Sequence, residues 1–400
     1  MAVTRKKVAV GAAAMVAAAA IGSGLALPAN AAPTEGTVVG ANSAKAIKGS
    51  YIVTMKKNAV NVKSSAAQGK KVVANYGGQV KDTYTTALNG YSAKMSEQEA
   101  KQLAADPQVD QVFANHRYSI AGEQANPPSW GLDRIDSKKP DLDKKYKYPD
   151  KAGEGVKVYV IDTGTRASHK DFEDRVEKGF DAVDGGNADD GNGHGTHTSS
   201  TVAGKTYGVA KKAKIVPVRV LDDNGSGSTE GVVKGIDWVA KNAKGPSAAN
   251  MSLGGPADEA LDKAVKETIS KGVTFAVAAG NESQDAGNSS PARVPEAITV
   301  GATDNKDNQA EFSNFGKALD IYAPGVQITG AWNSGDDAKK TIDGTSMASP
   351  HVAGAAAVYL SGHTDAKPDA VSKALVEGGA KDAVQSPGQG SPNVLLNVVE

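Results

Sequence analysis

The chain of 400 residues contains no cysteine, which excludes disulfide bonds and any chemistry that depends on a thiol. It also lacks an excess of charge of either sign, because 45 Lys and Arg residues balance 45 Asp and Glu residues. A balanced charge argues against an electrostatic binder of nucleic acid. Aromatic residues make up only 5% of the chain, whereas its 45 glycines suit close-packed helices and many turns. The length is sufficient for one large core and a small additional domain.

The N-terminus has the pattern of a targeting segment. Basic residues at 5–7 precede an Ala-rich apolar run at 8–27, and Ala29-Asn30-Ala31 is an A-x-A cleavage signal. The run approaches the length of a membrane anchor, but alanine is only weakly apolar. We therefore predict a signal peptide over 1–31, a secreted extracellular protein and no membrane attachment. Because disulfides are excluded, the candidate sources of stability are a large core and bound calcium.

A first compact pattern covers 49–120 and follows a leader at 32–48 that we predict to be flexible. Strand, helix, two strands, helix and strand are predicted in turn at 50–55, 63–77, 79–95, 96–106 and 108–120. The order βαββαβ is that of a small α+β ferredoxin-like domain.

Local signals support this assignment. The paired strands flank Asn89-Gly90, a dipeptide typical of hairpin turns. The second helix opens with Ser96 and Glu99, which have the spacing of a capping box. After it the polar, Pro-rich segment 121–131 predicts a domain boundary and an exposed site for proteolytic cutting.

From about residue 153 the pattern changes to buried strands that alternate with helices. Val-, Ile- and Ala-rich strands are predicted at 156–162, 213–221, 248–254, 273–281 and 297–303, and helices at 228–243 and 258–272. Near-continuous apolar strands with helices between them indicate a parallel sheet covered on both faces. We therefore predict an α/β fold with a doubly wound, mostly parallel sheet, whose chemistry lies at the carboxyl ends of its strands.

The stretch DGTSMASPHVAG, residues 343–354, leads into a long apolar run that suits a buried helix. A proline is tolerated in a helix only in the first turn, so we expect the helix to begin a few residues before Pro350. Ser346 would then lie at or beside the N-terminus, where backbone N–H groups and the positive end of the helix dipole collect. On this stretch alone, Ser346 is either an N-cap or a nucleophile whose oxyanion those groups would stabilise.

Three more polar residues stand at predicted strand ends or helix starts. Asp162 ends VKVYVID, Asn281 ends VTFAVAAGN, and His194 lies between two glycines in NGHGTHTSSTVAG. A serine is a poor nucleophile until a base takes its proton, and histidine is the natural base at neutral pH. Asp162 would orient His194 and stabilise its charged form. The Asn281 amide and the Ser346 N–H would form an oxyanion hole.

Each of these residues also has a plainer interpretation. Asp162 and Asn281 can be turn residues, and His194 with His197 has the H-x-x-H spacing of metal ligands. That pair lacks the glutamate and the spacing of zinc proteases, and no third ligand is evident, so a zinc site is disfavoured.

Four sequence blocks resemble the subtilisin-like serine proteases. They are VIDTG at 160–164, GHGTHTSSTVAG at 193–204, AAGN at 278–281 and GTSMASPHVAG at 344–354. The order Asp, His, Ser is the subtilisin order. WGLDRID at 130–136 and VLDDNGSGS at 220–228 are most similar to the proteinase K and aqualysin branch. The resemblance covers 125–395 and implies that Ser346 is the nucleophile, and the βαββαβ unit resembles the inhibitory propeptide of this family.

The resemblance also implies where substrate binds, as an added strand between two segments with a pocket for the P1 side chain beside them. The implied residues are Gly225, Ser226, Gly227, Ser252, Leu253, Gly254, Ala278, Ala279 and Gly280. Small apolar walls favour an apolar or aromatic P1 residue and broad cleavage. Loop residues near Ser289 can reshape this pocket, and Asp222 and Asp223 can attract basic residues. His197 and His351 flank the catalytic motifs and are not expected to act as acid or base.

Structural calcium is the cofactor that the resemblance implies. One site would use the Asp320 carboxylate and the backbone carbonyls of Pro295 and Ala297. A second site would use the carboxylates of Asp133, Asp136 and Asp143. In the second site Ser137 and Lys145 stand where oxygen side chains are expected, and a lysine there opposes cation binding.

Together these features predict a secreted serine endopeptidase, made as a self-processing zymogen and acting as a monomer on protein and peptide substrates. The predicted parts are the signal peptide 1–31, a propeptide 32–121 that inhibits the enzyme and aids its folding, and the peptidase domain 122–400. The processing cut is expected between Ile120 and Gln124. Two alternatives remain, a catalytically silent subtilisin-fold binding protein and a serine esterase or lipase, which would use G-x-S-x-G and a different residue order.

Overall fold

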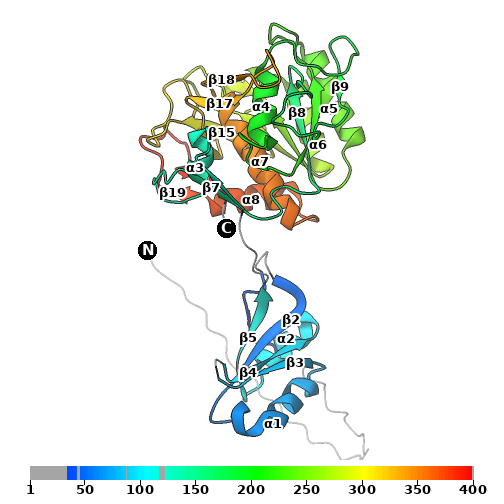
Figure 1. Cartoon of the computed structure of the whole chain (residues 1–400), viewed down its shortest axis with the longest axis vertical. Coiled ribbons are helices and arrows are strands. Elements are labelled where there is room, and N and C mark those ends of the chain that lie inside the picture. The colour runs from blue at the N-terminus through cyan, green and yellow to red at the C-terminus, as the bar shows by residue number, and fades with distance from the viewer. Residues whose placement is uncertain (1–33, 43–45, 87, 117–121, 399–400) are drawn as a thin grey trace, which may run out of the picture. The chain divides into compact units, whose positions relative to one another are not determined.

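The computed structural model describes residues 34–42, 46–86, 88–116 and 122–398 as two compact units, which divide between Asn115 and His116 (Figure 1). We call them the small unit and the large unit and describe each by itself. The predicted signal peptide lies outside the described residues. Among the residues that are described, no helix is long and apolar enough to cross a membrane.

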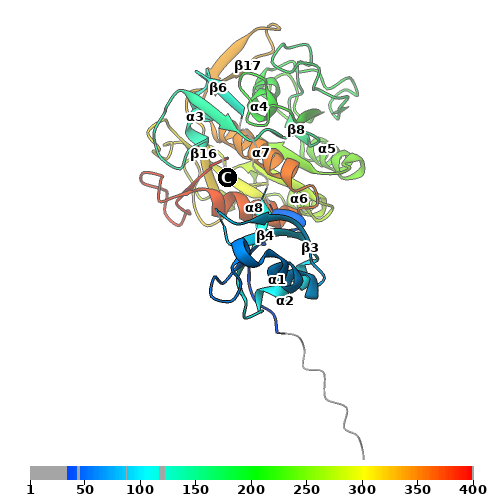
Figure 2. The same cartoon turned by 60° about the horizontal axis from the view of Figure 1, so that its bottom comes forward.

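The small unit has the predicted βαββαβ order, with one short strand before it. Its elements are β1 (Val38–Val39), β2 (Ala46–Met55), α1 (Val62–Asn75), β3 (Gln79–Tyr84), β4 (Gly90–Lys94), α2 (Glu97–Ala104) and β5 (Val109–His116). The sheet order is β1-β5-β2-β4-β3, and α1 and α2 lie on the same face of the sheet (Figure 2). The capping box is confirmed, because the Ser96 side chain accepts the Glu99 N–H and the Glu99 carboxylate accepts the Ser96 N–H.

Two local predictions in the small unit are wrong. The segment 32–48 is not simply a flexible leader, because β1 pairs in parallel with β5 and β2 already begins at Ala46. Asn89-Gly90 is not the tight turn of the hairpin, because the connection between β3 and β4 spans 85–89 and Gly90 opens β4. The Asn89 side chain instead accepts the Val62 N–H and donates to the carbonyls of Met55 and Val60, so tertiary hydrogen bonds override the local turn preference.

The large unit contains the predicted doubly wound sheet, with the strand order β19-β20-β16-β15-β13-β11-β8-β10-β9. Its strands are β8 (Lys157–Asp162), β9 (Phe180–Asp181), β10 (Lys214–Arg219), β11 (Ser247–Met251), β13 (Val273–Ala278), β15 (Ile298–Thr303), β16 (Ile321–Pro324), β19 (Ala380–Lys381) and β20 (Val394–Leu395). All neighbouring pairs from β16 to β9 are parallel, and β19 pairs antiparallel with β20. The predicted fold class is therefore confirmed.

Helices and short hairpins complete this unit. The helices are α3 (Trp130–Ile135), α4 (His194–Ala203), α5 (Thr229–Asn242), α6 (Glu259–Ser270), the 3-10 turn η1 (Ala286–Asn288), α7 (Thr345–Gly362) and α8 (Pro368–Gly378). The two-stranded pairs are β6 (Gly122–Ala125) with β7 (Lys145–Tyr148), β12 (Gly255–Pro256) with β14 (Ser289–Ser290), and β17 (Ile328–Ala331) with β18 (Lys339–Ile342).

Side-chain alternation along the central strands builds two cores, one on each face of the sheet. From β8, Val158 and Val160 enter the core that contains Val352 and Ala356 of α7. Tyr159 and Ile161 enter the opposite core, which α5 and α6 cover. Because both faces are covered, polar groups of these strands reach solvent only at the strand ends, and this is where the predicted site residues stand.

Candidate active site

The carboxyl ends of β8, β11 and β13 meet at one edge of the sheet. Ile161 of β8 is aligned with Met251 of β11, which is aligned in turn with Val277 of β13. Asp162 ends β8, whereas Ser252 and Asn281 follow the ends of β11 and β13. The parallel register therefore brings together segments that are separated by up to 119 residues in the chain, the difference between 162 and 281.

Asp162 and His194 form a direct hydrogen-bonded pair. The Nδ1 atom of His194, the first residue of α4, lies 2.7 Å from Asp162 Oδ1 and 3.0 Å from Oδ2. The Asp162 side chain is fully buried and also accepts the Thr163 N–H at 2.7 Å and the Thr198 hydroxyl at 3.2 Å. These contacts fix the carboxylate, which makes Nδ1 the protonated ring nitrogen and leaves Nε2 free to accept a proton.

The charge of Asp162 also sets the basicity of His194. Burial of the ring opposes its charged form, but the Asp162 carboxylate, its hydrogen bond and the nearby Asp190 charge together outweigh burial and raise the pKa of His194 above its ordinary value. The imidazole side chain keeps 24% of its surface exposed. His194 can therefore take up a proton from a group that arrives from solvent.

Ser346 is the second residue of α7, and it is not the N-cap. Gly344 is the N-cap, and no side chain caps the helix at that position. The partly exposed Ser346 hydroxyl donates to the backbone carbonyl of Ser252 at 3.2 Å. The plainer interpretation of Ser346 as a capping residue is therefore wrong, and its hydroxyl is held next to a backbone segment at the sheet edge.

Pro350 is the sixth residue of α7, one turn deeper than the first-turn position that we predicted. A proline there has no N–H for the carbonyl of Ser346, four residues earlier. The hydroxyl of Ser252 fills this gap by donating to the Ser346 carbonyl at 2.7 Å, and the Asn250 amide donates in turn to the Ser252 hydroxyl. The hydrogen bond that replaces the missing helix bond thus connects Ser346, the nucleophile candidate, to the segment after β11.

Asn281 faces the start of α7. Its Oδ1 atom accepts the Thr345 N–H at 2.8 Å and the Thr345 hydroxyl at 2.9 Å, so the amide nitrogen points the other way. A Cβ atom placed on Gly344, whose φ is +150°, would lie 3.5 Å from Ser346 N and 3.8 Å from Asn281 Nδ2. Two N–H donors therefore border one small space that stays open because residue 344 is glycine.

Thr345 is a residue that the sequence analysis missed. Its hydroxyl donates to Asn281 and accepts the Gly280 N–H at 3.1 Å, so it sets the direction of the Asn281 amide. The available signal was its position directly before Ser346, where a threonine hydroxyl can reach the preceding turn.

A groove of about 590 Å³ runs beside this site. His194 lines it together with six of the predicted substrate-binding residues, Gly225, Ser226, Gly227, Ser252, Leu253 and Gly254. Ala278, Ala279 and Gly280 do not line this groove. Ala278 and Ala279 are buried, and the Gly280 N–H contacts Thr345.

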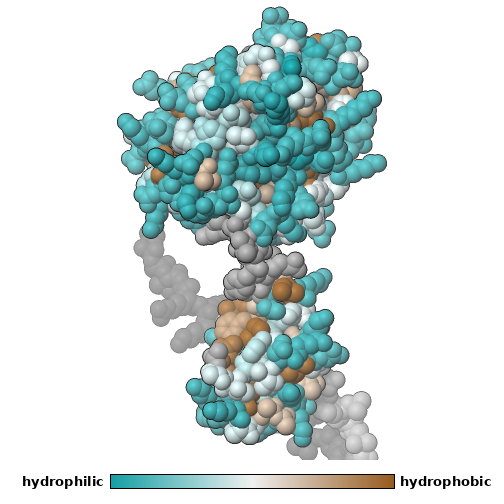
Figure 3. All heavy atoms as spheres, viewed as in Figure 1, coloured by the Kyte–Doolittle hydropathy of each residue, from teal (hydrophilic) through white to brown (hydrophobic). Residues whose placement is uncertain are grey.

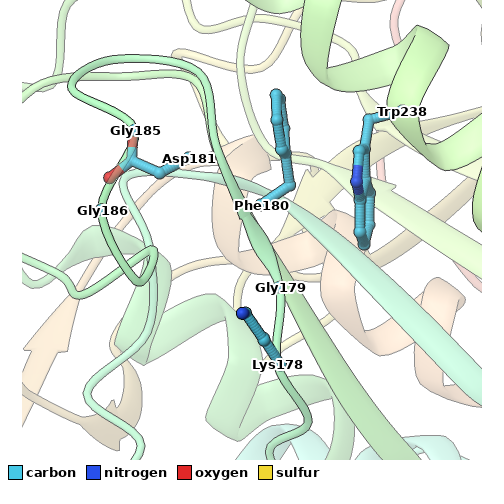
Figure 4. A pocket seen from close by; sticks show the side chains of 7 residues that line it. All are labelled: Lys178, Gly179, Phe180, Asp181, Gly185, Gly186 and Trp238. Atoms are coloured by element: carbon cyan, nitrogen blue, oxygen red, sulfur yellow. The ribbon is translucent and has the colours of Figure 1, made fainter.

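A second cavity of about 400 Å³ lies beside β9 and α5 and is lined by Lys178, Gly179, Phe180, Asp181, Gly185, Gly186 and Trp238 (Figure 4). The rings of Phe180 and Trp238 stack with centroids 5.4 Å apart and planes 10° apart. This spacing leaves no room for a third ring between them, and none of the predicted site residues lines this cavity.

His197 and His351 are fully buried, and burial lowers the pKa of each to about 4. His197 Nε2 lies 3.1 Å from the Ile328 carbonyl, and His351 Nδ1 lies 2.8 Å from the Met347 carbonyl. Both rings therefore stay neutral at physiological pH. In the described part of the chain, no group of three or more His, Asp or Glu side chains is placed to hold a metal ion.

Asp320, the candidate carboxylate of the first calcium site, is largely buried, and its side chain accepts one hydrogen bond, from the Thr299 N–H at 2.8 Å. Burial raises the pKa of Asp320 to about 6. In the described chain no Lys or Arg forms an ion pair with it. A poorly compensated, largely buried carboxylate is a donor that fits a hard cation such as calcium.

The three carboxylates of the second predicted calcium site have other partners. Asp133 accepts the N–H groups of Asp143 and Lys144, and Asp136 accepts the Lys147 N–H. Asp143 forms an ion pair with Lys147 at 2.9 Å. Backbone hydrogen bonds and a lysine thus satisfy these groups, which weighs against a cation between them.

Comparisons with known proteins assign a family to each unit of the chain. The profile of the family described as Subtilase family matches residues 153–391, and the profile described as Peptidase inhibitor I9 matches residues 50–121. The chain is 45% identical over 387 residues to an extracellular serine proteinase of Thermus sp. strain Rt41A, which covers 92% of this chain and 94% of that protein.

Two further proteins match this chain over most of their own length. A cuticle-degrading serine protease of Arthrobotrys oligospora is 42% identical over 396 residues, which is 93% of this chain and 96% of that protein. The crystal structure of a cold adapted subtilisin-like serine proteinase is 48% identical with a TM-score of 0.66, and the match covers 68% of this chain and 98% of that one.

Proposed function

The chain belongs to the subtilase family of serine peptidases, and on this premise we propose that it is a secreted endopeptidase that processes its own precursor. We assign Ser346 as the nucleophile, His194 as the general base and Asp162 as the partner of His194. The observation that carries this assignment is the 2.7 Å bond between a buried carboxylate and a partly exposed imidazole, at the sheet edge where α7 presents Ser346.

Binding of a peptide would prepare the nucleophile. The Ser346 hydroxyl now donates to the Ser252 carbonyl, a group that a substrate strand paired with Ser252–Gly254 would use for its own N–H. Competition for this carbonyl releases the Ser346 hydroxyl toward His194 Nε2. His194 then takes the proton as Ser346 attacks the peptide carbonyl, Asp162 stabilises the imidazolium, and His194 returns the proton to the leaving amine.

The negative oxygen of the tetrahedral intermediate would be held by the Ser346 N–H and the Asn281 amide. Both donors border the space above Gly344, and Thr345 fixes the amide in this direction. Donors that are in place before the reaction cost no reorganisation during it.

The groove supports a broad specificity with an apolar or aromatic P1 residue. Leu221, Val232 and Leu253 give it apolar walls, while glycines at 225, 227 and 254 leave the backbone open to a substrate strand. Protein and peptide substrates fit this site, and we propose that the mature enzyme acts as a monomer.

Structural calcium is proposed at Asp320, with the carbonyls of Pro295 and Ala297 as further ligands. A bound cation would compensate the buried charge and stabilise the folded state. The proposal does not extend to Asp133, Asp136 and Asp143, because their present partners satisfy them.

The small unit is proposed to be the inhibitory part of a propeptide spanning 32–121, after a signal peptide at 1–31. Helices cover one face of its sheet, and apolar surface gathers on the face of this unit shown in Figure 3. Two of the large apolar side chains of the small unit, Val39 and Leu88, are each 43% exposed. Exposed apolar surface of this kind suits a protein partner. A cut on the N-terminal side of Gly122 leaves β6 and its pairing with β7 intact, so we place the start of the mature enzyme there.

The decisive experiment compares the wild-type precursor with Ser346→Ala, both expressed for secretion, with exposed Ser334→Ala as the control. We expect the wild type and the control to shorten to the mature size and to react with a fluorophosphonate probe, whereas Ser346→Ala stays at precursor size and does not react. Labelling of a folded Ser346→Ala protein would contradict the assigned nucleophile. A folded wild type that is not labelled would favour the silent binding protein.

A further inference from the structure

We infer that Asp190, which no sequence motif singled out, is a positioning residue that holds the Asp162–His194 pair in its catalytic geometry. The inference rests on the proposed function of His194 as the general base. It follows from the way in which helix α4, which begins at His194, is capped.

The start of α4 has no cap of its own. Gly193 occupies the N-cap position with φ of +115°, and a Cβ atom there would lie 2.3 Å from the Trp332 ring. No serine, threonine or aspartate can therefore stand at this position, although these residues cap helices best. The unpaired N–H groups of the first turn need acceptors from elsewhere.

Three side chains supply these acceptors. The His194 N–H donates to Asn192 Oδ1 at 3.2 Å, and the Gly195 N–H donates to Thr163 Oγ1 at 2.9 Å. The Thr196 N–H donates to Asp190 Oδ2 at 2.8 Å. A carboxylate beside the first turn also interacts favourably with the positive end of the helix dipole.

Asp190 does more than cap the helix, because its other oxygen reaches the end of β8. Asp190 Oδ1 accepts the Thr163 hydroxyl at 2.8 Å, together with the N–H groups of Asn192 and Gly193 at 2.9 and 2.8 Å. The Thr196 hydroxyl adds a bond of 2.6 Å to Oδ2. The five hydrogen bonds of one carboxylate thus connect the residue after Asp162 with the first turn that carries His194.

The charge of Asp190 acts on the same pair. The charged groups that face His194 are Asp162 at the end of β8 and Asp190 in the loop before α4. His197 on the same helix is buried and neutral. No Lys or Arg of the described residues forms an ion pair with Asp190, so its negative charge is not cancelled locally. Asp190 therefore favours both the geometry and the protonated form of His194.

The test compares Asp190→Asn with Asp189→Asn, which removes the same charge one residue earlier from an exposed side chain without a side-chain hydrogen bond in the described chain. We expect Asp190→Asn to lower kcat on the order of 10- to 100-fold, since small misplacements of catalytic groups have effects of this size. We expect KM to change far less, and Asp189→Asn to leave both constants close to those of the wild type.

A second readout does not need activity. In the uncleaved Ser346→Ala precursor, an NMR titration of the imidazole proton of His194, assigned with a His194→Gln variant, should show a lower pKa with Asp190→Asn and an unchanged one with Asp189→Asn. A lower melting temperature without a change in kcat or in this titration would reduce Asp190 to a helix cap and overturn the inference. If both variants lowered the pKa of His194 equally, the effect of Asp190 would be that of any nearby charge, and the inference would be wrong.

If Asp190→Asn does not fold, Thr163→Val tests the same link. It removes the hydroxyl between Asp190 and Gly195 and keeps every charge. We expect a lower kcat with an unchanged His194 titration, and an unchanged kcat would overturn the inference. Because the titration is made in an inactive precursor, it tests Asp190 even if the wild type proves not to be a protease.

Discussion

Two histidines three residues apart on α4 show how single contacts decide chemistry. His194 faces the Asp162 carboxylate, and its pKa is raised despite burial of the ring. His197 faces a backbone carbonyl, and burial lowers its pKa to about 4. The same residue type on the same helix thus has a raised pKa in one place, which fits the base that we propose, and is a neutral packing group in the other.

The raised pKa of His194 predicts the acid limb of the pH profile. His194 must be neutral to accept a proton, so kcat/KM falls as the pH drops through its pKa in the free enzyme. Because this pKa is raised, we expect the midpoint above the ordinary histidine value of about 6.5. Initial rates on a neutral peptide at low substrate concentration between pH 4 and 9 measure it. A midpoint well below 6 would show that Asp162 does not hold the charged form.

The oxyanion role that we propose for Asn281 predicts a specific kinetic change. Asn281→Ala should lower kcat by about 10²–10³-fold with little change in KM, since the bond forms mainly in the transition state. Asn281→Ala also removes the acceptor of the Thr345 N–H and hydroxyl, so the control is Asn281→Asp, which keeps an acceptor oxygen and loses the amide donor. An increase in KM with normal kcat would place Asn281 in substrate binding instead.

At the scale of elements, α7 lacks one of its backbone hydrogen bonds near its start. Pro350 cannot donate to the Ser346 carbonyl, and the Ser252 hydroxyl replaces the missing helix bond. Behind it, Asn250 donates to Ser252 and accepts the Ser349 hydroxyl, so both ends of this chain of hydrogen bonds lie on α7. The helix start is thereby fixed to β11, on which the substrate strand would lie.

A double-mutant cycle tests this connection. Ser252→Ala leaves the Ser346 carbonyl without its donor and should cost about 1–3 kcal/mol of unfolding free energy. Adding Pro350→Ala supplies a backbone N–H to that carbonyl, so the double variant should recover part of the loss. Denaturant unfolding of the inactive Ser346→Ala protein measures both without self-digestion. Strictly additive effects would show that Ser252 and Pro350 act independently.

At the scale of the whole molecule, the large unit has no disulfide and gains its stability from two apolar cores on either side of one sheet. The largely buried Asp320, which lies directly before β16, opposes this stability as long as its charge is uncompensated. A cation at this point would act on the folded state alone, and its effect would appear in global unfolding.

Calcium removal should therefore lower the melting temperature. With calcium at about 100 times its Kd, binding adds about 2.7 kcal/mol, which corresponds to roughly 4–6 °C for a domain of this size. Differential scanning calorimetry of inhibited enzyme with calcium or with chelator measures the shift. Asp320→Asn should abolish the difference between the two conditions. A chelator effect that persists in this variant would place the calcium elsewhere.

The elements of both units were largely predictable because their signals are local. Apolar periodicity located the strands of the parallel sheet and the helices that cover it, and the Ser96–Glu99 capping box located α2. The predictions failed where a distant contact overrides a local preference. Asn89 makes three tertiary hydrogen bonds and does not form the expected tight turn. Pro350 is tolerated beyond the first turn of α7 because the Ser252 hydroxyl replaces the backbone N–H that proline lacks. β1 was missed because a strand of two residues is too short to show an alternation of apolar and polar side chains.

The sequence by itself determined which residues could do chemistry and in what order, because motif spacing and residue type are properties of the linear chain. Only the tertiary structure decided how they work together. The parallel register aligned the strand ends, and the hydrogen bonds of Thr345 set the direction of the Asn281 amide. The glycine at 193 left the capping of α4 to the side chains of Asn192, Thr163 and Asp190. These relations join residues far apart in the chain, and their distances are set by packing, which no local pattern contains.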